Sequence, residues 1–226
     1  LRRDWFVDDF TLAELKMLRA RQSFEGRGTE ADGLHEIPTL QEVIDLVRRK
    51  QAAGSGSVGL YPETKSPAHF RDAGFDFATA LVDVLEANDL PNPSIPVIVQ
   101  SFEADVLRDL SVRTDLRLAQ LVRPKSRAEA NVPNIPLETI ATYADGVGAM
   151  KFLLVTRSGA DSGFVARAQA LGLFVHAWTF RDDALPPLEP DAASEYDRYI
   201  ALEVDGLFTD FPDTALAAVA RHRNPH

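Results

Sequence analysis

The 226-residue chain contains 45% hydrophobic and 26% charged residues, a composition typical of a globular protein of about one large domain. No apolar run is long enough to cross a bilayer, and the absence of cysteine excludes disulfide scaffolds, thiolate zinc sites and cysteine nucleophiles. A formal net charge of -10 argues against nucleic acid as a partner, although a metal ion or local cations could still attract a small phosphorylated ligand.

The first part of the chain carries two capping-box patterns that predict helices. Thr11 is followed by Glu14, with leucines at helical spacing up to residue 20, and Thr39 is followed by Glu42 ahead of a periodic stretch that ends at residue 50. Residues 21–36 have three glycines and no periodicity, so we expect a long exposed loop between these helices.

Six short apolar segments then alternate with helical stretches, and this alternation predicts a parallel sheet covered by helices. The expected strands are 58–61, 97–99, 116–122, 146–151, 173–179 and 205–210, and the expected helices include 75–88, 103–110, 137–143, 162–171 and one opened by Pro212. A flavodoxin-like open sheet also fits. Because several strands end in polar residues, we favour a (β/α)₈ TIM-type barrel of the α/β class, occupying residues 1–226 as a single domain.

Glu63 and Lys65 lie two residues apart at the end of the first expected strand, so their side chains should point to the same side. A hard divalent cation takes oxygen ligands, and a transferring phosphoryl group needs countercharge. Glu63 as metal ligand and Lys65 as phosphate contact therefore form one coherent site. The alternative is an ordinary surface ion pair at a strand end.

Polar and aromatic residues mark the ends of other strands. Gln100 and Lys151 are expected in the same mouth, and Trp178 could form the wall of a ligand pocket. His176 shares a face with Trp178. It could be a general acid or base, but a hydrogen-bonded structural histidine is the favoured interpretation.

Three aspartates accompany the last strand and the terminal helix. Asp205 and Asp210 flank the strand, and for Asp210 a structural role is favoured over metal coordination. Asp213 is expected to cap the helix that follows.

Six motifs, taken in order and spacing, resemble the glycerophosphodiester phosphodiesterase family. They are Phe10-Thr11-Leu12-Ala13-Glu14-Leu15-Lys16, Ile37-Pro38-Thr39-Leu40-Gln41-Glu42-Val43, Tyr61-Pro62-Glu63-Thr64-Lys65, Gln100-Ser101-Phe102, Val175-His176-Ala177-Trp178-Thr179-Phe180 and Asp205-Gly206-Leu207-Phe208-Thr209-Asp210-Phe211-Pro212. The resemblance covers nearly the whole chain.

The resemblance implies a barrel enzyme that hydrolyses glycerophosphodiesters to glycerol 3-phosphate and an alcohol with Ca²⁺ or Mg²⁺. By likeness, Glu63 is a metal ligand, Lys65 is the catalytic, phosphate-side lysine, and Gln100, Trp178 and Phe208 contact the substrate. Related barrel diesterases, of the phospholipase D or sphingomyelinase D type, and a non-catalytic binding module are the alternatives.

The sequence also departs from the family pattern. The His-Arg-Gly motif, the paired acidic ligands and the second catalytic histidine have no match, so we expect them, with two βα units, ahead of Leu1, inside a longer gene product. Residues 1–36 resemble part of an insertion found in larger, often exported members, which favours a periplasmic or secreted bacterial protein. The oligomeric state is not indicated.

Overall fold

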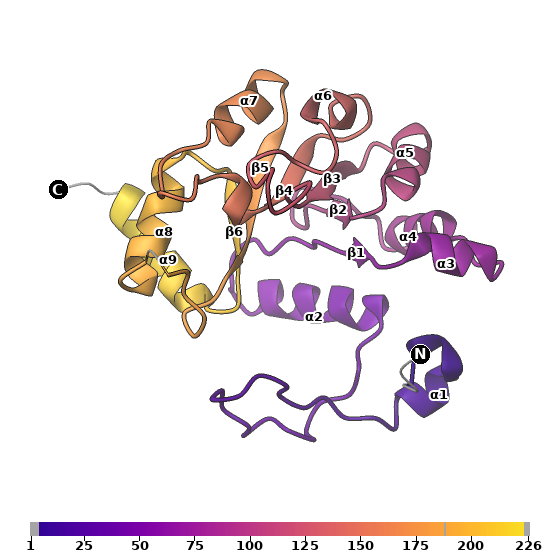
Figure 1. Ribbon diagram of the computed structural model, residues 1–226. Coiled ribbons are helices and arrows are strands. Elements are labelled where there is room, and N and C mark those ends of the chain that lie inside the picture. Colours follow the sequence, from indigo (N-terminus) through magenta and orange to yellow (C-terminus); the bar gives the residue numbers. More distant parts are fainter. Residues whose placement is uncertain (1–4, 188, 224–226) are drawn as a thin grey trace. The chain divides into compact units, whose positions relative to one another are not determined.

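The computed structural model describes residues 5–187 and 189–223 (Figure 1). The chain separates into two compact units, Leu1–Val58 and Gly59–His226. All the predicted site residues belong to the second unit. The organisation of the chain as a single barrel domain stays a prediction.

The first unit contains the short helix η1 (Val7–Asp9) and the helices α1 (Leu12–Leu15) and α2 (Leu40–Ala52). Both predicted capping boxes are confirmed, because the Thr11 and Thr39 hydroxyls accept the N–H groups of Glu14 and Glu42. Helix α1 is shorter than predicted: the N–H of Ala20 bonds to the His35 carbonyl instead of extending the helix. Residues 21–36 form no helix or strand, as expected.

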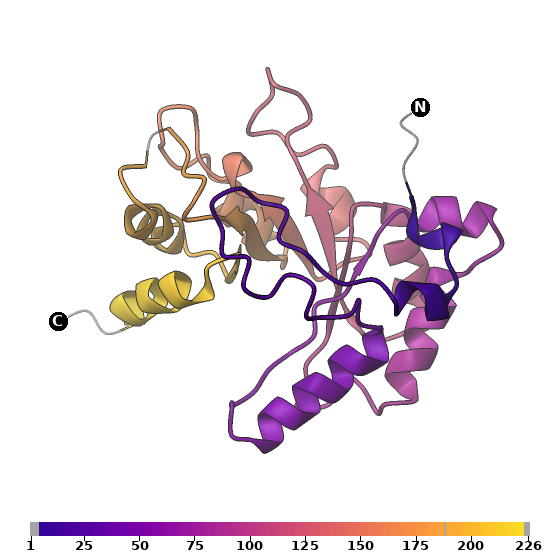
Figure 2. The ribbon, with the colours of Figure 1, turned by 90° about the horizontal axis from the view of Figure 1, so that it is seen from below.

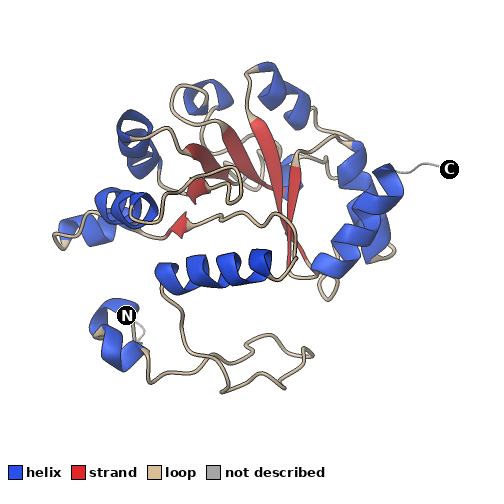
Figure 3. Cartoon of the chain, turned by 180° about the vertical axis from the view of Figure 1, so that it is seen from behind, coloured by secondary structure: helices blue, strands red, loops and turns tan. Residues whose placement is uncertain are grey.

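The second unit is built on one sheet, drawn in red in Figure 3, and its parallel strands have the order β1-β2-β3-β4-β5-β6 (Figure 1). The strands are β1 (Glu63–Thr64), β2 (Ile98–Ser101), β3 (Arg117–Val122), β4 (Gly146–Met150), β5 (Phe174–Phe180) and β6 (Gly206–Thr209). Five of them match the predicted segments closely. The sequence order of the strands is therefore also their spatial order, which places all carboxyl ends at one edge.

The first strand lies later than predicted. Residues 58–61 form only an isolated bridge, Leu60 to Val97, and the ladder proper begins at Glu63. The Pro62 carbonyl accepts a hydrogen bond from the backbone N–H of Gln100. Proline has no backbone N–H to donate, so Pro62 interrupts the ladder.

Helices cover the outer face of this sheet (Figure 1). They are α3 (Pro67–Asp72), α4 (Phe77–Glu86), α5 (Ala104–Arg113), α6 (Leu137–Ile140) and α7 (Phe164–Ala170), followed by α8 (Ala192–Ala201) and α9 (Pro212–Arg223), with the short η2 (Lys151–Leu153) after β4. Figure 2 shows α8 and α9 side by side. The sequence analysis missed α3 and α8, although Asp191 caps α8 through the N–H of Ser194.

Two strands begin with the same Asp-Gly pair, and the aspartates tie neighbouring strands together. The Asp145 carboxylate accepts the N–H of Leu118, and the Asp205 carboxylate accepts the N–H of Val175, each at 2.8 Å. Asp205 therefore lies at the amino end of β6, the opposite end from the predicted site, and its role is structural.

Within the described ranges, 5–187 and 189–223, no helix combines the length and apolar character that a membrane span requires.

Candidate active-site cleft

A small cleft of about 160 Å³ opens at the carboxyl ends of the strands in the second unit. Its lining residues come from β1, β2, β3, β5 and β6 and the segments that follow them: Glu63, Lys65, Gln100, Phe102, Leu121, Trp178, Thr179 and Phe208. All five residues predicted for the site lie here. Phe102, Leu121 and Thr179 had no predicted role, although Phe102 follows Gln100 at the two-residue spacing that shares a strand face.

Glu63 and Lys65 form an ion pair across the cleft mouth. The Lys65 Nζ lies 3.6 Å from the Glu63 carboxylate, and the lysine side chain is 80% exposed whereas that of the glutamate is 24% exposed. An exposed pair of this kind contributes little to stability. The carboxylate is thus held inside the cleft, whereas the ammonium group lies largely in solvent, where an incoming anion can reach it.

Gln100 stands beside Glu63, because these two residues are register partners in the β1–β2 ladder. Its side chain is buried, and its Oε1 atom has no hydrogen-bond partner within the described part of the chain. A buried amide oxygen without a partner costs about 1 to 3 kcal/mol. A ligand atom entering the cleft could offset this cost by donating a hydrogen bond to the Gln100 Oε1 atom.

Aromatic rings form one wall of the cleft. The Trp178 indole donates from Nε1 to the Gly148 carbonyl at 2.8 Å, and Phe102 contacts the indole edge-on with 5.7 Å between ring centroids. Phe208 packs against Tyr61 at 4.9 Å. Since its N–H is already used, Trp178 offers an apolar face, as the sequence analysis expected of a pocket wall.

A Gly148→Ala substitution is expected to destabilise the protein by about 1 to 3 kcal/mol through overpacking. The added Cβ would lie 2.5 Å from Leu121 Cδ2, so the Leu121 side chain must move, whereas Trp178 Cδ1 at 3.6 Å is at ordinary van der Waals distance. Urea denaturation and tryptophan fluorescence would measure the change. Gly28→Ala is the control, because its Cβ would meet only the flexible side chain of Glu30; equal stabilities of the two variants would contradict the prediction.

His176 does not line the cleft. Its Nδ1 lies 3.1 Å from the Tyr61 hydroxyl, and burial lowers the pKa of the imidazole from 6.5 to about 4. The histidine is therefore neutral near pH 7 and held by Tyr61, which supports the structural interpretation of the sequence analysis.

The lowered pKa of His176 predicts a stability that falls on acidification. Below pH 6.5 the unfolded chain binds a proton that the folded chain resists, so the free energy of unfolding should drop from pH 6.5 to about 4 and then level off. A His176→Gln variant should show a flatter profile over that range in urea titrations. His35→Gln, at an exposed position, should keep the wild-type slope; a wild-type slope in His176→Gln would contradict the assignment.

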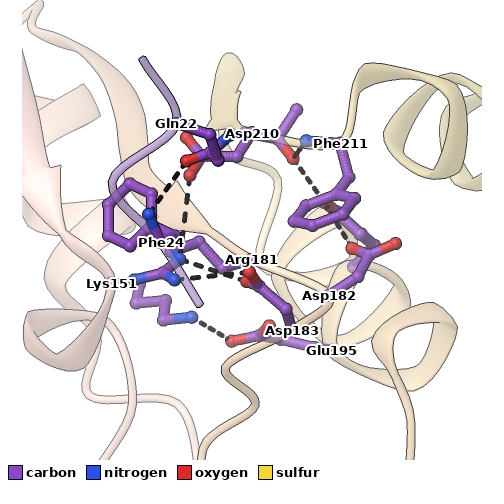
Figure 4. A network of polar contacts seen from close by, with 11 residues as sticks. Gln22, Phe24, Lys151, Arg181, Asp182, Asp183, Glu195, Asp210 and Phe211 are labelled. Carbon is purple, nitrogen blue, oxygen red and sulfur yellow. Dashed lines mark hydrogen bonds and ion pairs between the residues drawn. The ribbon is translucent and has the colours of Figure 1, made fainter. Parts of the chain in front are cut away.

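Lys151 is not in the mouth, contrary to the sequence-based expectation. It is buried, and its Nζ lies 2.5 Å from the Glu195 carboxylate of α8 (Figure 4). Asp210 lies 3.7 Å from Arg181, consistent with a structural role. Asp213 is the second residue of α9 and therefore not its N-cap, contrary to the prediction. Its negative charge in the first turn can still interact favourably with the helix dipole.

A divalent cation is the cofactor that this type of site implies, and the residues present fit one side of such a site. Glu63 supplies a carboxylate, an oxygen donor of the hard type that Ca²⁺ and Mg²⁺ prefer. No group of three or more His, Cys, Asp or Glu residues suited to a metal occurs among the described residues.

The fold and the cleft together define the class of protein to which the chain belongs. In (β/α)-barrel enzymes, parallel strands alternate with helices, and polar side chains from several strand ends lie together at one edge of the sheet. The sequence profile of the glycerophosphoryl diester phosphodiesterase family matches residues 2–214, and the chain belongs to this enzyme family.

Relatives with the corresponding names are found in bacteria and plants. The chain is 25% identical to a glycerophosphodiester phosphodiesterase of Haemophilus influenzae over 94% of its own length, and 30% identical to one of Arabidopsis thaliana over 92%. It spans 69% and 62% of the lengths of these two relatives.

Solved structures share the fold. A putative glycerophosphoryl diester phosphodiesterase from Agrobacterium tumefaciens aligns with a TM-score of 0.64 at 21% identity, over 95% of this chain and 73% of that one. A second, from Silicibacter pomeroyi, aligns with a TM-score of 0.61 at 22% identity, over 83% of this chain and 58% of that one. These likenesses confirm the predicted TIM-type (β/α) fold.

Proposed function

We propose that this chain takes part in the metal-assisted hydrolysis of glycerophosphodiesters to glycerol 3-phosphate and an alcohol. The observation that carries the proposal is the convergence of Glu63, Lys65, Gln100, Trp178 and Phe208 on one cleft at the carboxyl edge of the sheet. Family membership supports the same substrate class.

In the proposed reaction, a water oxygen forms a bond to phosphorus while the bond between phosphorus and the alcohol oxygen breaks. The water loses a proton and the departing alcohol oxygen gains one. Lys65 offsets the negative charge that gathers on the phosphoryl oxygens. A bound Ca²⁺ or Mg²⁺ held partly by Glu63 would supply further charge stabilisation. Gln100 and the aromatic wall orient the glycerol part of the substrate.

The two proton transfers need groups beyond the cleft residues. Among the described residues, none of the cleft lining is a histidine, and His176 is engaged with Tyr61. In our proposal a pair of histidines from a segment preceding Leu1 transfers the protons, as the family resemblance implies.

The test is release of glycerol 3-phosphate from glycerophosphocholine in Ca²⁺ or Mg²⁺, with a chelator control. Both this chain and the product of the full reading frame are assayed. The proposal is supported if the longer protein releases glycerol 3-phosphate and the chelator abolishes this release. Release of choline from lysophosphatidylcholine or sphingomyelin alone would favour the related diesterases, and no turnover by either protein would favour a binding module.

We also propose an exported location, in the periplasm or outside the cell, because residues 1–36 resemble part of the insertion of exported family members. Fractionation of cells that express the full reading frame would decide it. Recovery of the protein in the cytoplasmic fraction alone would contradict the proposal.

A further inference from the structure

A second, much larger cavity lies on the same side of the second unit as the cleft. This groove has a volume of about 790 Å³ and is lined by the loops that follow β3, β4 and β5, together with Tyr199 of α8. Its walls are largely apolar and include Pro124, Phe152, Val155 and Pro186. A polar diester small enough for the 160 Å³ cleft would leave such a groove unfilled.

The floor of the groove is fixed by buried polar contacts. The Tyr199 hydroxyl donates to the Lys151 carbonyl at 3.2 Å, and the Lys151 ammonium pairs with Glu195 (Figure 4). Phe152, the next residue, projects from this anchor and stays 42% exposed. The apolar surface is therefore preformed, which reduces the entropy lost on binding.

The charge of the groove is positive, although the chain as a whole carries a net charge of -10. Arg127 and Arg157 both line it, and within residues 5–187 and 189–223 neither has a carboxylate partner; Arg157 Nη2 instead donates to the Arg127 carbonyl at 2.9 Å. Glu189 is the one carboxylate among the described lining residues, and it is neutralised by Arg198 at 2.6 Å. Two guanidinium groups thus remain available to an anion.

We propose that this groove binds a single-chain anionic amphiphile, with its hydrocarbon chain along the apolar walls and its anionic head at Arg127 and Arg157. Guanidinium groups suit phosphate and carboxylate heads, and an open apolar groove suits methylene chains.

The groove lies close to the cleft along the chain. Leu121 lines the cleft and Pro124 lines the groove, and three residues span at most about 10 Å. Because its anionic head lies at Arg127 and Arg157 and not in the cleft, the amphiphile is a ligand separate from the diester that the cleft takes.

Binding is tested by isothermal titration calorimetry with octyl phosphate, dodecyl phosphate and dodecyl maltoside, all below their micelle concentrations and without metal. A fully buried methylene changes affinity about fourfold, so four methylenes in an open groove should tighten dodecyl phosphate over octyl phosphate by at least about tenfold. The uncharged maltoside should bind more weakly than dodecyl phosphate. Equal affinities for the two phosphates would overturn the proposal.

Matched variants locate the site. An Arg127→Ala and Arg157→Ala double variant should weaken dodecyl phosphate binding at least about tenfold while leaving maltoside binding unchanged. Phe152→Ser should reduce the difference in affinity between dodecyl phosphate and octyl phosphate. Arg49→Ala, on α2, and Val112→Ser, at an 83% exposed position of α5, are the controls and should bind as wild type. Equal losses of dodecyl phosphate affinity in the control variants and the groove variants would overturn the proposal.

Calorimetric binding does not require turnover, so it tests the groove independently of the proposed function, and a competition assay adds a second test. If dodecyl phosphate competitively inhibits hydrolysis of lysophosphatidylcholine but not of glycerophosphocholine, the groove holds the chain of a substrate, and the proposal of a separate ligand is overturned. Binding that inhibits neither reaction, or that occurs in a protein without turnover, identifies a separate lipid site.

Discussion

A Glu63→Gln enzyme is expected to lose roughly 100- to 1000-fold in turnover of glycerophosphocholine, the range that follows removal of one group that stabilises charge in a transition state. The amide keeps the size of the side chain but removes the negative charge from the cleft. Metal affinity, followed by calorimetry with Ca²⁺ or Mg²⁺, should fall together with turnover.

The control for this change is Glu129→Gln, because Glu129 pairs with Lys125 at 3.1 Å on the surface much as Glu63 pairs with Lys65. The control should keep full activity, and thermal unfolding should show that both variants remain folded. Full activity and unchanged metal affinity in Glu63→Gln would remove Glu63 from the site.

Replacing Lys151 by Met is expected to lower the free energy of unfolding by about 3 to 5 kcal/mol, because it leaves the Glu195 carboxylate buried without its countercharge. Both side chains are nearly inaccessible, at 7% and 1% exposure, and the second carboxylate oxygen of Glu195 already has no partner within the described residues. Burial also raises the pKa of Glu195. Urea denaturation at neutral pH would measure the loss.

A second substitution tests whether the unpaired charge causes the loss. Lys151→Met combined with Glu195→Leu removes both charges and should recover most of the stability, since a buried ion pair can often be replaced by apolar side chains. Lys125→Met, at a 58% exposed lysine, should change stability by less than about 0.5 kcal/mol. A double variant no more stable than Lys151→Met would show that packing, not charge, is lost.

The candidate site was predictable because its residues follow the simplest rule of a parallel sheet. Gln100, Trp178 and Phe208 each lie within two residues of the carboxyl end of a strand, Glu63 lies in the two-residue strand β1, and such ends meet at one edge whatever the details of packing. Leu121 was not predictable in the same way. It is one apolar residue in a run of similar ones, and it reaches the cleft because Gly148 leaves room beside it.

The sequence determined the order of the strands and of the helices other than α3 and α8, the capping of α2 and the polar strand ends, because these depend on local periodicity and on residues close together in the chain. Whether a cation at a strand end is available to a ligand was decided only by the tertiary structure. Lys65 and Lys151 occupy similar places in the sequence pattern, yet Lys65 is 80% exposed and Lys151 is buried. The difference arises because α8 brings Glu195, 44 residues away, onto the end of β4, and no local pattern encodes that contact.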